Sequence, residues 1–296
     1  MADVTAAYPP TRGRRAREVV FRTLSAVALL FVIGPSLWLI ADVVVRAVPH
    51  WHWDVLTTVP LGTGGGLENA VLGTLVIMVG VLLIAGTVGV LSGIHFAELA
   101  RPRRSGRAGG AVLRTATEVL SGFPSIVLGY VGYIALCVGL HWGFSLLPAL
   151  IVLSLMVTPY IAKSTESALR QVPTSYREGA EALGMSTGYA LRKVVIRSAL
   201  PGIVTGLLIA LAIAVGETAP LIYTAGITNT LPSASLIHQP IAYLTYYVWT
   251  DYNQPIKSTQ YLSFDAALIL IVLVLVLLVV SRVLVNRTQR HAEGRR

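Results

Sequence analysis

The sequence predicts an all-α membrane protein with six transmembrane helices. The composition, the number of long apolar segments and the placement of the basic residues support this prediction. Of 296 residues, 54% are hydrophobic and 12% are charged, whereas a soluble domain carries about 25% charged residues. The mean hydropathy is +0.70. This composition argues against a cytosolic enzyme, a disordered chain and a nucleic-acid-binding domain.

Six segments are long and apolar enough to cross a bilayer, which needs about 20 residues per helix. They are 23–47, 69–97, 118–140, 146–165, 203–226 and 265–285. We therefore expect an N-terminal tail (1–22), a six-span domain (23–285) and a C-terminal tail (286–296). Within the six-span domain, the longest connections are expected at about 166–200 and 227–262.

The basic residues define the topology. Of the 23 Lys and Arg residues, 21 lie before the first span, after the sixth, or around the loops that join spans two to three and four to five. Only Arg46 and Lys257 fall on the other side. By the positive-inside rule, both termini are then cytoplasmic, which six spans allow. The net charge of +9 thus reports topology, and we expect a membrane protein with no nucleic-acid partner.

No motif for bond-breaking chemistry is visible. The single Cys137 excludes a disulfide framework, and neither zinc-ligand spacing nor a phosphate-binding loop occurs. We expect no catalytic residue, no metal ligand and no cofactor in this chain. Six helices without an energy-converting site indicate a pore, a carrier, or the membrane half of a pump driven by a partner.

A short helix is predicted in the loop between spans four and five. Pro173 stops the preceding helix. Ser175 and Glu178 fit a capping box that starts a new one, and Gly184 fits the position after its end. Tyr176, Ala180 and Leu183 share one face. Such a helix is either an ordinary amphipathic loop element or one that a cytoplasmic partner moves.

The residues of this loop resemble the EAA loop of ABC importer permeases. The resemblance rests on Glu178-Gly179-Ala180, followed by Gly184 and by Leu200-Pro201. Gly179 replaces the usual Ala, at about 1 kcal/mol of helix propensity. The resemblance implies that the loop seats in a groove of an ATPase subunit. The implied coupling residues are Arg177, Glu178, Gly179, Ala180, Glu181 and Gly184.

Two further stretches resemble segments of phosphate importer permeases. They are Gly216-Glu-Thr-Ala-Pro-Leu221 and Gly122-Phe-Pro-Ser-Ile-Val127. The resemblance implies a type I ABC importer permease in a bacterial inner membrane that carries phosphate. It also implies a homologous permease partner, an ATPase dimer that binds ATP and Mg²⁺, and an external phosphate-binding protein. The ending at Ala219–Ala225 favours one of the two homologous permease subunits over its sister.

Glu217 is the acidic residue deepest inside a span, and such residues are functional candidates by default. Gly216 and Pro220 predict a kink or break beside it. We expect a translocation path or gate formed by Glu217, Thr218, Thr224 and Ser125. For the segment around Ser125, a helix bend that only permits close packing is the alternative.

A carboxylate is a poor ligand for an anion, so Glu217 needs a second explanation. It is protonated, paired with a cation, or hydrogen-bonded between helices. The resemblance leads us to expect an Arg one turn earlier, but residues 211–215 contain no base. A cation from the sister subunit is the favoured hypothesis.

Three other interpretations stay open. The chain is alternatively the sister subunit, or a permease for another oxyanion such as sulfate or molybdate. From a different class, it is an autonomous secondary carrier or channel, which predicts inverted repeats and paired ionisable groups.

The small-residue pairs Gly89/Gly93 and Gly202/Gly206 are interpreted as helix packing contacts.

Overall fold

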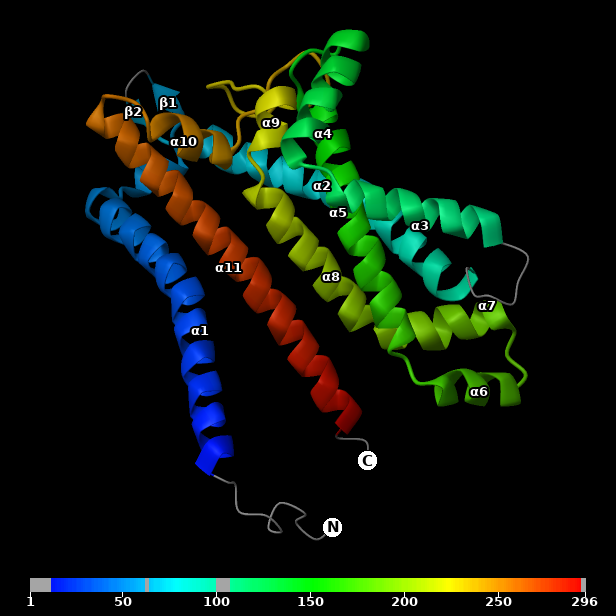
Figure 1. Cartoon of the computed structure of the whole chain (residues 1–296). Helices are drawn as coiled ribbons and strands as arrows, with labels where there is room; N and C mark the ends of the chain where they lie inside the picture. The colour runs from blue at the N-terminus through cyan, green and yellow to red at the C-terminus, as the bar shows by residue number, and fades with distance from the viewer. Residues whose placement is uncertain (1–11, 62–63, 100–106, 294–296) are drawn as a thin grey trace. The chain divides into compact units, whose positions relative to one another are not determined.

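The structure, a computed structural model, describes residues 12–61, 64–99 and 107–293 (Figure 1). The chain divides into two compact units, residues 1–49 and 50–296. The first unit is built on α1 (Arg12–Ala47), a 36-residue helix with Pro35 inside it. Its apolar side chains are exposed, with Phe31 at 80% and Trp38 at 75%. Exposed apolar side chains all along a helix suit contact with lipid or with another membrane chain.

The second unit is almost entirely helical. It begins at the end of η2 (Val48–His50) and has a two-stranded antiparallel hairpin, β1 (Pro60–Leu61) with β2 (Gly64–Gly65). Its other elements are η3 (Trp53–Leu56), α2 (Glu68–Ile94), η4 (His95–Leu99), α3 (Arg107–Gly122), α4 (Ser125–Gly132), η5 (Tyr133–Gly139), α5 (Leu146–Arg170), α6 (Thr174–Ala182), α7 (Thr187–Ala190), η6 (Leu191–Val195), α8 (Ile196–Gly216), α9 (Ala219–Thr224), α10 (Leu244–Asp251) and α11 (Lys257–Glu293).

The core of this unit lies where α2, α5 and α8 pack together. α5 lies against both α2 and α8, and α8 also packs against α11 (Figure 1). The buried side chains at the centre include Val81 from α2, Leu153 from α5 and Leu211 from α8. Tyr243, which precedes α10, packs into the same cluster, and only 1% of its surface is exposed.

Glycines let these helices approach closely, as the small-residue pairs predict. A Cβ on Gly93 of α2 would lie 2.5 Å from the Thr165 Cβ of α5, and one on Gly89 would lie 2.6 Å from the Ile161 Cβ. On α8, a Cβ on Gly202 would lie 2.8 Å from the Ala168 Cβ. The interpretation of both pairs as packing contacts is confirmed.

The membrane spans agree with the prediction in number but differ in two places. Within the described residues, five helices are long and apolar enough to span, and the number is six if the bent pair of α3 with α4–η5 counts as one span. The segment predicted as one span over 118–140 is interrupted at the expected kink, where the chain turns by 104° after Gly122. The fifth span begins at Thr187 rather than at 203, because the exposed basic residues that suggested a loop lie on the solvent-facing side of a helix.

The short helix α6 forms where the sequence places it, but its start differs. Its N-cap is Pro173 and no side chain caps it, so the predicted Ser175–Glu178 capping box is wrong. The extended Pro173 (φ −55°, ψ 140°) already sets the turn into the helix. The end is confirmed: Gly184 has φ 72°, its N–H donates to the Glu181 carbonyl (2.9 Å), and the N–H of Met185 donates to Ala180 (3.0 Å). These two bonds form a Schellman motif.

We predict that Gly93→Ala destabilises the protein. The added methyl group meets both the Thr165 Cβ and the Ala162 carbonyl oxygen, so α2 and α5 must separate. Overpacking of this kind costs about 1–3 kcal/mol. Thermal unfolding of the purified protein in detergent should show a lower midpoint. The control is Gly34→Ala, where a Cβ meets nothing within 4 Å; equal midpoints for the two variants would contradict the packing argument.

Candidate translocation site and coupling surface

The first of two helix breaks separates α3 from α4. Pro124 has no backbone N–H to donate and adopts an extended conformation (φ −60°, ψ 131°). α3 ends at Gly122 and α4 restarts at Ser125, with a bend of 104° between the flanking helices. The kink expected from the Gly-Phe-Pro-Ser stretch is therefore a full change of direction. It places the Ser125 side chain at the start of a new helix.

The second break separates α8 from α9, as Gly216 and Pro220 predict. α8 ends at Gly216, Glu217 is extended (φ −75°, ψ 131°), and Pro220 lies in the first turn of α9. The backbone carbonyl of Glu217 is left without a helical partner. The hydroxyl of Thr245, on α10, donates to it at 3.0 Å.

The two breaks meet each other. α4 and α9 pack side by side (Figure 1), and a Cβ on Gly129 would lie 2.6 Å from the Pro220 Cα. One turn further along both helices, Gly132 lies next to Thr224. The contacts advance in the same direction on both helices, so α4 and α9 run parallel and begin at the same end. At that end the Ser125 hydroxyl hydrogen-bonds the Glu217 carboxyl group.

This contact answers part of the question about Glu217. Among the described residues no ion pair involves Glu217, and its hydrogen bond joins two broken helices. The group also lies at the N-terminal end of α4, where the helix dipole stabilises negative charge. Of the three explanations, this contact supports the interhelical hydrogen bond, and the protonated form of Glu217 stays a prediction. The cation of a sister subunit stays a prediction.

The four predicted path residues have different surroundings. Ser125, Glu217 and Thr218 are partly exposed and lie at the two breaks. Thr224 is completely buried, and its hydroxyl donates to the Pro220 carbonyl at 2.8 Å within α9. We therefore leave Thr224 out of the path and assign it to the packing of α9 against α4.

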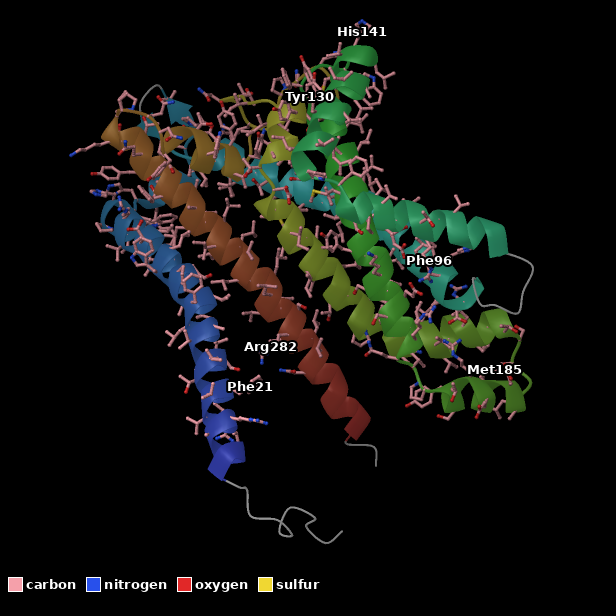
Figure 2. The ribbon with its side chains drawn as sticks, viewed as in Figure 1. Phe21, Phe96, Tyr130, His141, Met185 and Arg282 are labelled. Atoms are coloured by element: carbon pink, nitrogen blue, oxygen red, sulfur yellow. The ribbon has the colours of Figure 1, made fainter. Side chains whose placement is uncertain are left out.

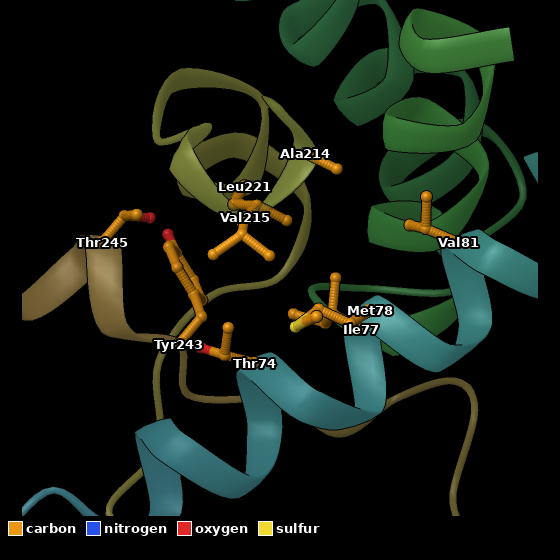
Figure 3. Close-up of a pocket in the computed structure, with 9 residues that line it drawn as sticks. All are labelled: Thr74, Ile77, Met78, Val81, Ala214, Val215, Leu221, Tyr243 and Thr245. Carbon is orange, nitrogen blue, oxygen red and sulfur yellow. The ribbon is translucent and has the colours of Figure 1, made fainter. Parts of the chain in front are cut away.

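A narrow cavity lies beside the second break (Figure 3). α2 contributes Thr74, Ile77, Met78 and Val81 to its lining, and residues on both sides of the break and at α10 complete it: Ala214, Val215, Leu221, Tyr243 and Thr245. The Tyr243 hydroxyl points into it beside Thr245 (Figure 3) and has no hydrogen-bond partner among the residues that the structure describes. Burial raises the pKa of the Tyr243 phenol, so it is a neutral donor.

Sequence reasoning missed the residues that hold α10 against this site. The Thr74 hydroxyl accepts the Leu244 N–H at 3.0 Å, and the Asn69 amide donates to the Tyr247 hydroxyl at 3.0 Å. The partners are 170 and 178 positions apart, so no local pattern connects them. The available signal is the type of residue: Asn69 and Thr74 are polar positions in a long apolar span.

The predicted coupling residues divide into an exposed and a buried set. Glu178, Gly179, Glu181 and Gly184 are exposed, and a Cβ on Gly179 would meet nothing within 4 Å. Together with the exposed Tyr176 (51%) and Leu183 (76%), they form what we call the coupling surface of α6. Ala180 is 4% exposed. Arg177 turns inward and pairs with Glu98 of η4 at 2.7 Å, a partner that sequence reasoning also missed.

Two broken helices that pack against each other beside a helical core, with a short exposed helix at one end, are features of a membrane transport subunit. A family model described as "Binding-protein-dependent transport system inner membrane component" matches residues 85–290. Within the described residues, no group of three or more His, Cys, Asp or Glu side chains is arranged to hold a metal ion.

The curated relatives match over nearly the whole chain. "Phosphate transport system permease protein PstA 2" of Mycobacterium bovis is 54% identical over 98% of this chain and 95% of its own. A PstA protein of Xylella fastidiosa is 33% identical, covering 96% and 98% of the two chains. The chain therefore belongs to the family of binding-protein-dependent inner membrane components and, within it, to the PstA permeases.

Solved structures support the fold. The MetNI methionine ABC transporter matches with a TM-score of 0.55 and 20% identity, covering 86% of this chain and 98% of that one. A bacterial ABC transporter involved in alginate import matches with a TM-score of 0.57 and 13% identity, covering 93% and 96%. At this identity the likeness concerns the fold alone. The predicted all-α fold class, a type I ABC importer permease in the inner membrane, is confirmed.

We predict that Thr245→Val loosens the second break. The valine keeps the shape of a side chain that is 6% exposed but leaves the Glu217 carbonyl without its donor, at a cost of about 1–3 kcal/mol. Hydrogen–deuterium exchange of the peptide covering 214–222 should become faster. Thr230→Val, at an exposed position, is the control. Unchanged exchange in the Thr245→Val variant would show that this hydrogen bond does not hold the break.

Proposed function

We propose that this chain is the permease subunit through which an ATP-driven importer moves inorganic phosphate into the cytoplasm. The observation that carries the proposal is the 54% identity, over 98% of the chain, to a protein named as a phosphate transport system permease. The broken helix that contains Gly216–Leu221 supports it, because this is the stretch that resembles phosphate importer permeases.

The proposal includes three partners. A homologous permease (PstC-like) completes the membrane pathway, and an external phosphate-binding protein (PstS-like) delivers the substrate. An ATPase dimer (PstB-like) binds ATP and Mg²⁺ and hydrolyses the ATP, so this chain breaks no bond and holds no cofactor. Both termini and α6 lie in the cytoplasm, as the placement of the basic residues predicts.

In this proposal, the two ends of the second unit have separate roles. The coupling surface of α6 contacts the ATPase, where Gly179 exposes bare backbone and Glu178 and Glu181 supply negative charge. The breaks at Ser125 and Glu217 form the gate, since the helices on either side of a break can change their angle without losing intrahelical hydrogen bonds. Alternating access follows when closure of the ATPase dimer moves α6 and the helices connected to it.

Reconstitution into vesicles tests this function against the alternatives. The chain assembled with its sister permease, the ATPase and the binding protein should transport phosphate only when ATP is present on the ATPase side of the membrane. Phosphate movement by the chain alone, without ATP or partners, would indicate an autonomous carrier. Preference for sulfate or molybdate over phosphate would assign a different oxyanion.

We predict that Glu217→Gln lowers phosphate uptake at least tenfold. Glutamine keeps the size of the side chain and a hydrogen bond to Ser125 but removes the charge, so the variant tests a charged gate. Uptake and ATP hydrolysis are measured in the reconstituted complex. Glu18→Gln, which removes a carboxylate from an exposed ion pair with Arg22, is the control. Full uptake by the Glu217→Gln variant would leave Glu217 with a packing role only.

We predict that Gly179→Leu weakens attachment of the ATPase without destabilising this chain. A Cβ at this position meets nothing within 4 Å, so the leucine fits in the isolated permease but protrudes from the coupling surface. Copurification of the ATPase should fall, while the unfolding midpoint of the permease stays unchanged. Retention of the ATPase at the wild-type level would place its binding surface elsewhere.

A further inference from the structure

Arg177 is the charged residue of α6 that faces inward. Among the described residues, its ion pair with Glu98 has the smallest exposed fraction. Arg177 donates to both carboxylate oxygens of Glu98, at 2.7 and 2.9 Å. The two side chains are 18% and 11% exposed. A bidentate pair with this little solvent fixes both distance and orientation. Since Glu98 belongs to η4, the pair joins α6 to the end of α2, 79 positions earlier in the chain.

The pair lies next to a small hydrophobic cluster rather than at a free surface. Ala97, beside Glu98, is 2% exposed and packs with Leu169 and Val195. Arg177 also approaches the Leu169 carbonyl at 3.5 Å. Because the surroundings are packed, neither charge can follow the other by a simple change of rotamer. A displacement of α6 therefore has to move η4 with it or break the pair.

A second set of contacts continues from η4 to α3. Phe96, 2% exposed, lies beside α3 (Figure 2) and stacks under the guanidinium of Arg114, 5.2 Å from the ring centre. Arg114 also pairs with Glu166 of α5 at 2.7 Å, and Arg170 pairs with the same carboxylate oxygen at 2.8 Å. Through Phe96 and Glu98, η4 thus contacts α3 on one side and α6 on the other.

The far end of α3 is the first helix break. α3 runs from Arg107 to Gly122, and Ser125, which bonds Glu217, follows shortly after its end. A rigid helix thus separates the contact with η4 from the gate. From α6 through η4 to α3, each step is an ion pair, a ring contact or a helix, and two residues, Phe123 and Pro124, then join the end of α3 to Ser125.

We propose that Glu98 and Arg177 are positioning residues that transmit the movement of α6 to α3 and so to the gate at Ser125 and Glu217. The inference rests on the proposed function and adds to it. It assigns Arg177 to a contact inside this chain instead of to the ATPase, and it makes η4 the element that carries the coupling.

The test separates coupling from folding and from ATPase attachment. Arg177→Glu and Glu98→Arg each place like charges together, and the double variant restores an opposite pair in reversed order. In the reconstituted complex we measure phosphate taken up, ATP hydrolysed and ATPase copurified. We expect each single variant to keep the ATPase but to raise the ATP hydrolysed per phosphate at least tenfold, and the double variant to recover at least half of the wild-type ratio.

Two milder variants cover the case in which a reversed charge prevents assembly. Glu98→Gln and Arg177→Lys keep the size of the side chains and weaken the bidentate pair, and both should raise the same ratio severalfold. Arg22→Glu, in the exposed pair with Glu18, is the control and should leave the ratio unchanged.

The outcomes that overturn the inference are distinct from those that overturn the function. If the assembled Glu98 and Arg177 variants keep the wild-type ratio, or lose the ATPase in proportion to uptake, the pair does not transmit movement. The same holds if the double variant assembles without recovery. If instead the wild-type complex transports no phosphate, the proposed function fails, whatever the variants do.

Discussion

The structure depends on one constraint: inside a membrane, every backbone polar group that leaves a helix must find a partner in the protein. The two breaks, at Phe123–Pro124 and Glu217–Thr218, satisfy this constraint together. Pro124 removes a donor, Ser125 and Glu217 bond across the breaks, and Thr245 supplies the donor for the Glu217 carbonyl. The side-chain contact between Ser125 and Glu217 links the two breaks, and this link suits them to act together as a gate.

The same constraint explains why the remaining helices are long and closely packed. α2, α5 and α8 keep their backbone hydrogen bonds internal, so glycines such as Gly89 and Gly93 can bring the helices into contact without exposing polar groups. The result is a stiff frame in which only a few elements differ from regular helix. In our proposal, movement occurs at the two breaks and at α6 and η4, and α3 joins these two levels.

How much of this the sequence predicts depends on how local each feature is. The apolar segments, the break at Gly216–Pro220 and the end of α6 at Gly184 are set by neighbouring residues, and these predictions are confirmed. The bend at Pro124 is larger than the predicted kink, because a proline alone does not say whether a helix kinks or turns away. The partners of Arg177 and of the Glu217 carbonyl lie 79 and 28 positions away, and only the tertiary fold brings them together. Glu98 carries a weak signal, since an acidic residue at the C-terminal end of a helix is electrostatically unfavourable unless a cation neutralises it.

The charge distribution leads to a last conclusion about the pathway. Between Arg114 and Lys163, and again between Arg197 and Lys257, the sequence contains no Lys or Arg. Both breaks lie within these stretches, so this chain brings no cation close to its gate in the sequence. In the fold, however, the Lys163 ammonium donates to the Ser121 hydroxyl at 3.2 Å, next to the first break. The N-terminal end of α4 is a second positive feature there, and the Glu217 carboxyl group already occupies it. An anion that passes this point needs a positive potential that exceeds the effect of Glu217. In a two-permease pathway, we expect Lys163 and the sister chain to supply it together, so that the positive potential at the gate is largest when both chains are present.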